Sequence, residues 1–286
     1  MIDAKQTAKG QAKSQAHTGN GKVFRDEYVR EAPSSSKAET SDFTSFQTWA
    51  ESALRHGQQQ NKTTALTLAD PAFAFRGMTL PKAEIEKLRG EILMLHQQHG
   101  TLSLGFASAQ RGEGTSTILA NLALALRKNN LRVLLVDLNL VHPNLPRLFS
   151  LADAPGLSDL IEGKIGLREV VRVVKSNKVF LLPLGKPRRP AGLDLANAIW
   201  AINIAAKNAK YFDLILFDLP PLNEFPQALY AARQTDGVIQ IVQAERTRVE
   251  VVRSLKAKLD QMGIQHFGVI LNQRRFHIPQ LIYENL

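Results

Sequence analysis

Six short apolar runs, separated by stretches that can hold a helix, constrain the fold of this chain more than any other feature. The run RVLLVD (Arg132–Asp137) is apolar on both faces, as is typical of parallel strands lying between two layers of helices. Alternation of such strands with helices of about 10–20 residues predicts a doubly wound, mostly parallel α/β sheet flanked by helices. The expected strands are Leu102–Ser108, Arg132–Asp137, Val179–Leu184, Leu214–Asp218, Gly237–Val242 and Gly268–Asn272.

The pattern begins with a helix and defines one domain over residues 81–286. Pro81–Gln97 opens with a proline in its first turn, where proline is favoured, and a second helix is expected over Ser116–Lys128. Residues 1–80 differ in composition. Gln, Lys, Ser, Thr, Gly and Asn dominate up to Asp42, which predicts a disordered tail.

One apolar patch interrupts this tail and predicts a short amphipathic helix near residues 43–55. Its apolar residues recur at spacings of three and four, and Ser41 or Asp42 can serve as the N-cap. Two interpretations are equally compatible with the pattern: packing on the chain's own domain, or docking on a partner. The patch consists of Phe43, Phe46, Trp49, Ala50, Ala53 and Leu54.

Composition excludes several classes of chemistry. The 286 residues contain no cysteine, which rules out disulfides, thiolate metal sites and a cysteine nucleophile. No apolar run reaches the roughly 18–20 residues that span a bilayer, and the first residues lack the core of a signal peptide, so we expect a cytoplasmic location. The formal net charge of +10 favours an acidic partner. Residues 81–286 hold 26 of the 36 basic and 18 of the 26 acidic residues, so the excess lies mainly in the predicted domain.

A glycine-rich loop, SAQRGEGTST (Ser108–Thr117), follows the first strand and leads into a helix. Gly112 and Gly114 allow backbone N–H groups to converge on an anion, and the helix N-terminus adds its positive dipole end. In a nucleotide-binding loop of this type the last glycine is followed by lysine and then by the Ser or Thr that ligates Mg²⁺. Ser116 fills the second position, but the lysine position holds Thr115.

Two of the apolar strands end in an aspartate, at Asp137 and Asp218. Acidic residues at the carboxyl ends of central parallel strands lie at the crevice where ligands bind in such sheets. Asp218 leads into Leu219-Pro220-Pro221. Together with the loop, these aspartates predict a nucleotide site.

With these motifs in place, residues 81–286 resemble the cytoplasmic domain of the bacterial tyrosine kinases that control capsule and exopolysaccharide synthesis. The segments that carry the resemblance are GEGTST with Asn121-Leu122-Ala123, VLLVDLNLVHP (Val133–Pro143), Gly156–Leu160, Leu182–Gly185, FDLPP (Phe217–Pro221), DGVIQIV and Gly268–Asn272. The resemblance implies a P-loop NTPase-like fold. It further implies ATP or ADP as ligand, with Arg111, Gly112, Glu113, Gly114, Thr115, Ser116 and Thr117 forming the nucleotide loop.

The same resemblance assigns further roles. Asp137 and Asp218 would be the catalytic carboxylates and, with Ser116, the Mg²⁺ ligands; Tyr283 is the candidate phospho-acceptor. A membrane polysaccharide co-polymerase is the implied partner, and association through it would bring the protein to the membrane. Ring-shaped homo-oligomers of the family use an early helix with one Glu and two Arg. In this chain Glu86 and Arg89 are present, but Ile92 occupies the position of the second arginine.

Several departures from the family pattern fall on charged groups. Thr115 stands in place of the loop lysine, Asn139 in place of an aspartate and Val141 in place of an arginine. Gln227-Ala228 stands where the family usually has Asp-Ala, and the tyrosine-rich C-terminal tail is reduced to Tyr283. Because phosphoryl transfer relies on positioning and charge stabilisation, these changes predict a very weak or inactive enzyme. Arg111, near the middle of the loop, is a candidate partial replacement for the lost charge.

Three functions remain open at this point. The first is a kinase-like regulator or scaffold of polysaccharide synthesis and export. The second is an active ATP-dependent tyrosine autokinase, and the third is a partitioning- or positioning-type ATPase that binds DNA or membrane. The third family carries an early loop lysine where this chain has Gln110, and no helix-turn-helix or aromatic-basic platform in the sequence supports nucleic acid as a partner.

Overall fold

The computed structural model describes residues 81–100, 102–151, 154–161, 165, 170–175, 178–186, 195–209 and 212–273. All of these fall within a single unit of the chain, Ser35–Leu286. The predictions made for residues 1–80, including the helix near 43–55, and for Tyr283 concern residues outside the described part.

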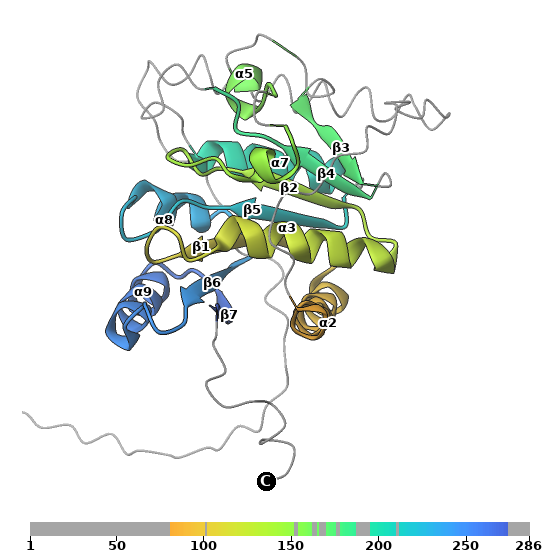
Figure 1. Ribbon diagram of the computed structural model, residues 1–286. Helices are drawn as coiled ribbons and strands as arrows, with labels where there is room; N and C mark the ends of the chain where they lie inside the picture. The colour runs from red at the N-terminus through yellow and green to blue at the C-terminus, as the bar shows by residue number, and fades with distance from the viewer. Residues whose placement is uncertain are drawn as a thin grey trace, which may run out of the picture. The chain divides into compact units, whose positions relative to one another are not determined.

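Seven strands form one sheet in the order β3-β4-β2-β5-β1-β6-β7 (Figure 1). All neighbouring pairs are parallel except β3 and β4, which confirms the predicted mostly parallel sheet. The six expected strands are present, and the added one is the antiparallel edge strand β3. The strands are β1 (Leu102–Ser108), β2 (Val133–Asp137), β3 (Arg172–Lys175), β4 (Val179–Leu182), β5 (Leu214–Asp218), β6 (Gly237–Gln243) and β7 (His266–Asn272).

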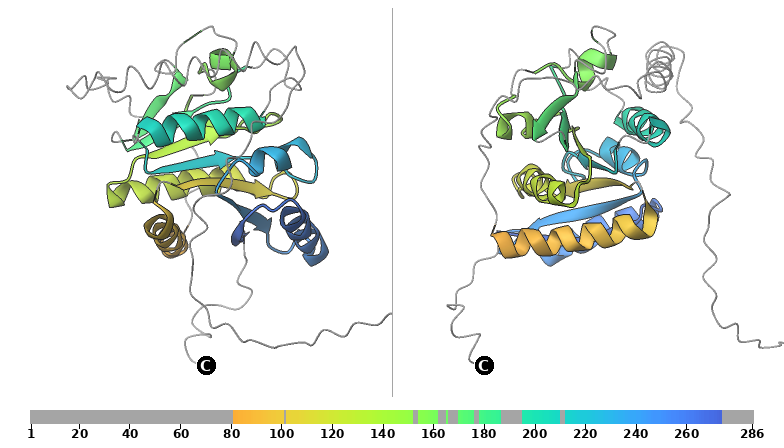
Figure 2. Two further views of the ribbon diagram at one scale, coloured as in Figure 1. Left: turned by 180° about the vertical axis from the view of Figure 1, so that it is seen from behind. Right: turned by 90° about the vertical axis from the view of Figure 1, so that its right-hand side faces the viewer.

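Helices lie on both faces of the sheet (Figure 2). The two helices expected from the sequence occur with slightly shifted ends, the second continuing into a 3-10 turn, η1 (Arg127–Asn129). No helix of the described part is long and apolar enough to cross a bilayer. The helices are α2 (Lys82–His99), α3 (Thr115–Leu126), α4 (Leu145–Leu148), α5 (Leu157–Ile161), α7 (Leu195–Ala209), α8 (Gln227–Ala232) and α9 (Val249–Gln261).

Two hydrophobic cores sandwich the sheet, because successive side chains of a strand point to opposite faces. In β2, Val133 and Leu135 belong to the core that includes residues of α2, α3 and α4, whereas Leu134 and Val136 belong to the core that includes residues of α5, α7, α8 and α9. Every residue of β2 and of β5 is therefore buried. This double burial explains why the central strands are continuous apolar runs.

The carboxyl ends of the central strands meet on one side of the sheet. Asp137 of β2 lies opposite Asp218 of β5, and Asp218 lies opposite Phe106 of β1. The loop that leaves β1 runs directly into α3 on this side, at the left of Figure 1. The topology thus brings the glycine-rich loop and both strand-end aspartates together.

The docking of α2 offers a test of the packing. Ile92 is the buried residue of this helix and is 1% exposed, whereas Met94, two residues on, is 57% exposed. Ile92→Ala should lower the free energy of unfolding by about 2–5 kcal/mol, because it leaves a cavity against the sheet. Met94→Ala should change it by less than about 0.5 kcal/mol. Urea unfolding of both variants measures the difference; equal losses would mean that α2 does not dock through Ile92.

Candidate nucleotide-binding site

The glycine-rich loop needs its two glycines for conformation and for space. Gly112 and Gly114 have φ of 80° and 91°, in the left-handed region that side chains disfavour. A Cβ on Gly114 would also lie 2.1 Å from Nδ2 of Asn272. The Asn272 amide donates a hydrogen bond of 2.7 Å to the main-chain oxygen of Glu113, which ties the loop to the end of β7.

Helix α3 begins directly at the loop, with Gly114 as its N-cap. Its first-turn N–H groups have no partners within the helix, and an anion is the natural acceptor for them. Thr115 is the first helical residue and is 9% exposed. The position that would hold the loop lysine is thus occupied by an uncharged and nearly buried threonine side chain, next to the N–H groups expected to bind phosphate. Thr117 follows in the same turn and its carbonyl accepts a hydrogen bond from Asn121.

The two strand-end aspartates form a fully buried pair. Both Asp137 and Asp218 are 0% exposed. Asp137 accepts hydrogen bonds from the main-chain N–H groups of Asn139 (3.0 Å) and Leu145 (3.2 Å). Asp218 accepts a 2.5 Å hydrogen bond from the hydroxyl of Ser116, the second residue of α3. The structure therefore brings together the three residues that the resemblance assigns to Mg²⁺.

Burial raises the pKa of both carboxyl groups. Burial is the largest cause for each, and for Asp137 the neighbouring charge of Asp218 adds to it, so the pKa of Asp137 lies well above its ordinary value. The pKa of Asp218 is raised to about 7, although its hydrogen bond from Ser116 favours the charged form. In the protein without metal, the pair accordingly retains protons at pH values where exposed carboxylates are ionised.

The donor set fits a Mg²⁺ ion. Oδ1 of Asp218 is buried and has no hydrogen-bond partner among the described residues. A buried carboxylate oxygen of this kind is costly unless a cation or a proton satisfies it. Carboxylate and hydroxyl oxygens are the ligands that Mg²⁺ takes, usually together with water and substrate phosphates. When bound, the ion would neutralise the aspartate pair and offset the negative charge of the phosphates.

Two charged side chains of the loop are engaged by other residues of the chain. Arg111 forms an ion pair of 2.5 Å with Glu224, and its Nη1 lies 3.1 Å from Nε2 of His142. Glu113 is 1% exposed, and its carboxylate accepts hydrogen bonds from the N–H of Gln110 and the hydroxyl of Thr247. The main-chain N–H of Arg111 also donates to Glu224, at 3.1 Å, so Arg111 is engaged through both its side chain and its backbone. Arg111, paired with Glu224, does not lie where the missing lysine would.

The turn after β2 keeps its shape without the family's second aspartate. Oδ1 of Asn139 accepts hydrogen bonds from the N–H groups of Val141 (3.3 Å) and His142 (3.1 Å). An aspartate could accept the same two bonds, so the amide preserves the turn while it removes a negative charge.

Sequence reasoning missed the residues that brace the loop. Asn272, Thr247 and Glu224 contact it from three different parts of the chain. Asn272 carried a usable signal, because it is a polar residue that ends an apolar strand, like Asp137 and Asp218. Nothing in the local sequence of Thr247 or Glu224 indicates their contacts.

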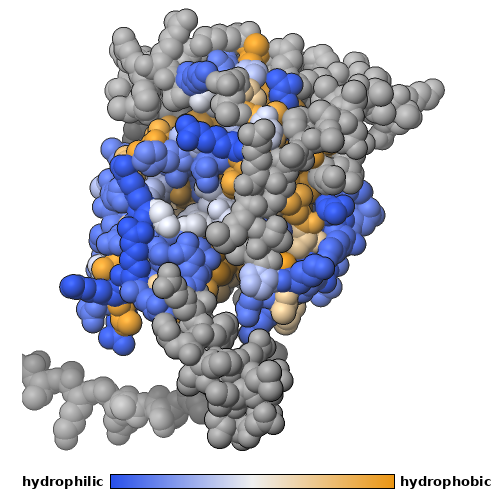
Figure 3. Space-filling model, in the orientation of Figure 1, coloured by the Kyte–Doolittle hydropathy of each residue, from blue (hydrophilic) through white to orange (hydrophobic). Residues whose placement is uncertain are grey.

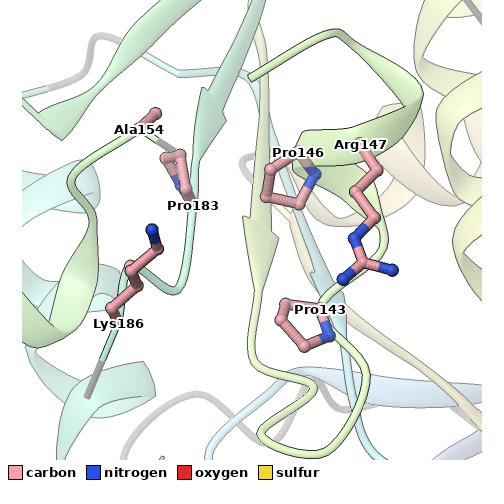
Figure 4. A pocket seen from close by; sticks show the side chains of 7 residues that line it. Pro143, Pro146, Arg147, Ala154, Pro183 and Lys186 are labelled. Carbon is pink, nitrogen blue, oxygen red and sulfur yellow. The ribbon is translucent and has the colours of Figure 1, made fainter. Parts of the chain in front are cut away.

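A hollow of about 210 Å³ lies on the same side of the sheet, between the segments that follow β2 and β4 (Figure 4). Arg147 and Lys186 are its two basic residues, and no acidic residue lines it, so it favours anionic groups. Figure 3 shows a mainly hydrophilic surface at the left, where the loops after the strands lie. The lining residues are Pro143, Pro146, Arg147, Ala154, Pro183, Gly185 and Lys186.

The residues expected to form a ring contact are engaged within the chain. Glu86 of α2 contacts Arg89 and Lys128, each at 2.5 Å, and Arg89 also donates to Oδ1 of Asn129 at 2.5 Å. The hydrogen bond from Lys128 is the largest of the causes that lower the pKa of Glu86. These contacts link α2 to η1, the 3-10 turn that follows α3. The formation of a homo-oligomer stays a prediction.

The fold and this site define a P-loop protein of the nucleotide-binding α/β class. The family model described as cellulose biosynthesis protein BcsQ matches residues 102–274. Since this match covers more than half of the chain, the protein belongs to the BcsQ family of P-loop proteins.

Relatives confirm the resemblance to bacterial tyrosine kinases. Tyrosine-protein kinase CpsD of Streptococcus agalactiae is 31% identical over 173 residues, which cover 59% of this chain and 73% of CpsD. Tyrosine-protein kinase YwqD of Bacillus subtilis is 26% identical over 202 residues, covering 69% of this chain and 85% of YwqD. Tyrosine-protein kinase Wzc of Salmonella typhi is 28% identical over 180 residues, 63% of this chain but 24% of Wzc.

Solved structures agree with the fold. The kinase domain of VpsO has a TM-score of 0.60 and 28% identity, with 68% of this chain and 95% of that chain covered. The septum site-determining protein MinD of Pyrococcus horikoshii, complexed with Mg-ADP, has a TM-score of 0.53 and 23% identity, covering 64% of this chain and 76% of MinD. At that identity, the likeness to MinD shows the shared fold alone.

The buried aspartate pair predicts an unusual pH dependence of stability. The folded protein keeps a proton on Asp218 up to about pH 7, whereas the unfolded chain releases it near 3.8. The free energy of unfolding should therefore fall as pH rises through this window and stay low above it. Asp218→Asn has no proton to lose, so without metal its advantage over the wild type should grow with pH, up to about 4 kcal/mol at pH 8.

Urea unfolding in EDTA between pH 4 and pH 8 measures this change. Asp260→Asn, which alters an exposed carboxylate on α9, is the matched control and should show no such growing advantage. A constant difference between Asp218→Asn and wild type across this range would contradict the protonated pair.

Proposed function

We propose that this protein is a nucleotide-binding, kinase-like regulator or scaffold of exopolysaccharide or capsule synthesis and export, with little or no kinase activity. The observation that carries the proposal is a P-loop framework in which the three candidate Mg²⁺ ligands lie together while Thr115 stands where the loop lysine is expected. Ser116 and the aspartate pair are in contact around α3, so the parts that bind are present while a central catalytic charge is absent.

Nucleotide binding is supported by the loop itself. Gly112 and Gly114 let main-chain N–H groups converge, and the 12-residue helix α3 begins at the same point. The unsatisfied Oδ1 of Asp218 offers Mg²⁺ a ligand that the described residues do not otherwise use. ATP or ADP with Mg²⁺ is the ligand that suits these donors.

Loss of catalysis is supported by the electrostatics. Phosphoryl transfer depends on cations that offset the charge on the transferred group, and removal of one preorganised electrostatic group typically costs about 10²–10³ in rate. Thr115 provides no charge, and Arg111 is paired with Glu224. Asp137 and Asp218 would then hold a Mg²⁺ ion that supports nucleotide binding rather than the turnover of ATP.

The link to polysaccharide synthesis comes from the relatives. The family model is described as a cellulose biosynthesis protein, and the similar CpsD, YwqD and Wzc are named tyrosine-protein kinases. We propose that this chain acts with a membrane polysaccharide co-polymerase, and that this contact brings a cytoplasmic protein to the membrane. Residues 81–286 would form the P-loop domain and residues 1–80 a tail for contacts.

The active autokinase is the second candidate. The aspartate pair and the Ser116 hydroxyl, which such an enzyme needs, are in place. Tyr283 would then be the phospho-acceptor.

Negligible ATP hydrolysis and autophosphorylation are therefore expected of the purified protein. Ordinary kinases turn over at about 1–100 s⁻¹, and the missing charge should lower this by at least about 10²-fold. Release of phosphate from ATP, with incorporation of labelled phosphate into protein, measures both reactions. Asp218→Ala is the control for contaminating ATPases. A rate of about 1 s⁻¹ that Asp218→Ala abolishes would favour the autokinase instead.

Restoring the lysine should tighten nucleotide binding. Thr115→Lys places a cation at the first turn of α3, where it can reach the β- and γ-phosphates. At a fixed Mg-ATP concentration it should bring a larger thermal shift than the wild type; at 100 times the dissociation constant, binding stabilises a fold by about 2.7 kcal/mol. Gln261→Lys adds the same charge at the exposed C-terminal end of α9, outside the glycine-rich loop, and should not do so. Absence of a shift in wild type and Thr115→Lys alike would argue against nucleotide binding.

A further inference from the structure

The turn between β6 and α9 lies against the glycine-rich loop. A Cβ on Gly112, in the middle of that loop, would lie 3.5 Å from Nη1 of Arg246. The guanidinium group therefore sits beside the loop backbone whose N–H groups are expected to surround the phosphates. Arg246 is distant from the loop in sequence, so only the fold reveals this neighbour.

Several contacts hold this turn in place. The buried Glu113 carboxylate accepts hydrogen bonds from the hydroxyl of Thr247 and from the N–H of Gln243 at 3.5 Å. The N–H of Ala244 donates to the carbonyl of Asn272, the residue that also anchors the loop. Glu245 adopts φ of 61°, a left-handed conformation that is uncommon for a residue with a side chain. Hydrogen bonds to the glycine-rich loop and to β7, together with the left-handed backbone at Glu245, thus fix the position of this turn.

The charge of Arg246 is not neutralised by a carboxylate in the described part of the chain. Its side chain is exposed, and its contact is a 3.0 Å hydrogen bond to Oε1 of Gln243, which is uncharged. Arg111 differs, because Glu224 pairs with it at 2.5 Å. Arg246 therefore presents a positive charge and free N–H donors next to the loop, whereas Arg111 does not.

We propose that Arg246 binds the phosphate chain of the nucleotide and so takes over, for binding, the cationic role that Thr115 cannot fill. The proposal rests on the nucleotide binding proposed above. A guanidinium group presents a fork of donors that matches phosphate oxygens. Arg246 approaches from the middle of the loop and not from the start of α3. It can therefore hold the nucleotide without occupying the position of the loop lysine. This agrees with a protein that binds nucleotide but has little or no kinase activity.

Arg246→Gln tests this role, because it removes the charge and keeps most of the side-chain length. Isothermal titration with Mg-ADP should show about ten- to a hundredfold weaker binding, the range expected for loss of a charge-assisted hydrogen bond. Inorganic pyrophosphate should lose affinity by a similar factor, since it carries the phosphates alone. Arg246→Lys should retain part of the affinity, and Thr115→Lys should restore binding in the Arg246→Gln background.

Arg253→Gln is the matched control, since it makes the same change of charge at an exposed position of α9. Its Mg-ADP affinity should equal that of the wild type, and the melting temperatures of both variants without nucleotide should be unchanged. Equal affinities for Arg246→Gln and Arg253→Gln would overturn the role of Arg246 and leave the proposed function standing. Weaker Mg-ADP binding with unchanged pyrophosphate binding would also overturn it, because Arg246 would then contact the nucleoside. Absence of nucleotide binding by the wild type at millimolar concentrations would reject the proposed function and this inference together.

Discussion

Two carboxylates that lie side by side without access to water are the feature on which the rest of this site depends. Asp137 and Asp218 end neighbouring strands in matching register and are fully buried. Main-chain N–H groups compensate Asp137, and the Ser116 hydroxyl compensates Asp218, but one oxygen of Asp218 lacks a partner in the described part of the chain. A pair of this kind needs a proton or a cation to be stable. Because Ser116 belongs to the first turn of α3, the pair also fixes where that helix begins.

A second set of contacts fixes the conformation of the glycine-rich loop. Asn272 binds the carbonyl of Glu113, and the buried Glu113 side chain binds Gln110 within the loop and Thr247 outside it. These bonds join β1, β6 and β7 at one point. A loop held in this way loses little conformational entropy when an anion binds, which favours binding even where one charge is missing.

The charges of side chains around the site can therefore change without a change in the backbone that positions them. Asn139 accepts the two main-chain hydrogen bonds that shape the turn after β2, although it lacks the charge of an aspartate. Thr115 fits the first turn of α3 although it lacks the charge of a lysine. Both substitutions leave the packing intact and alter only the electrostatics. The shape of the loop and of the turn after β2 therefore does not depend on a lysine at position 115 or on an aspartate at position 139.

The sequence by itself determined the class of fold and the main members of the site. Apolar runs on both faces of a strand are typical of parallel sheets that helices cover on both sides, and β2 and β5 carried this signal along their whole length. The edge strand β3 was missed, because its four residues, RVVK, place charged residues at both ends of a short segment. The loop and the strand-end aspartates were visible because local order alone, strand then loop then helix, defines them.

Only the tertiary structure decided which charges act at that site. Arg111 belongs to the loop, but its side chain forms an ion pair with Glu224. Arg246 is separated from the loop by more than a hundred residues in the sequence, yet it lies against Gly112. The raised pKa of Asp218 likewise follows from its burial, because the strand order places Asp218 in the centre of the sheet, opposite Asp137. Electrostatic interactions depend on distance and burial in space, and neither can be read from positions along a chain.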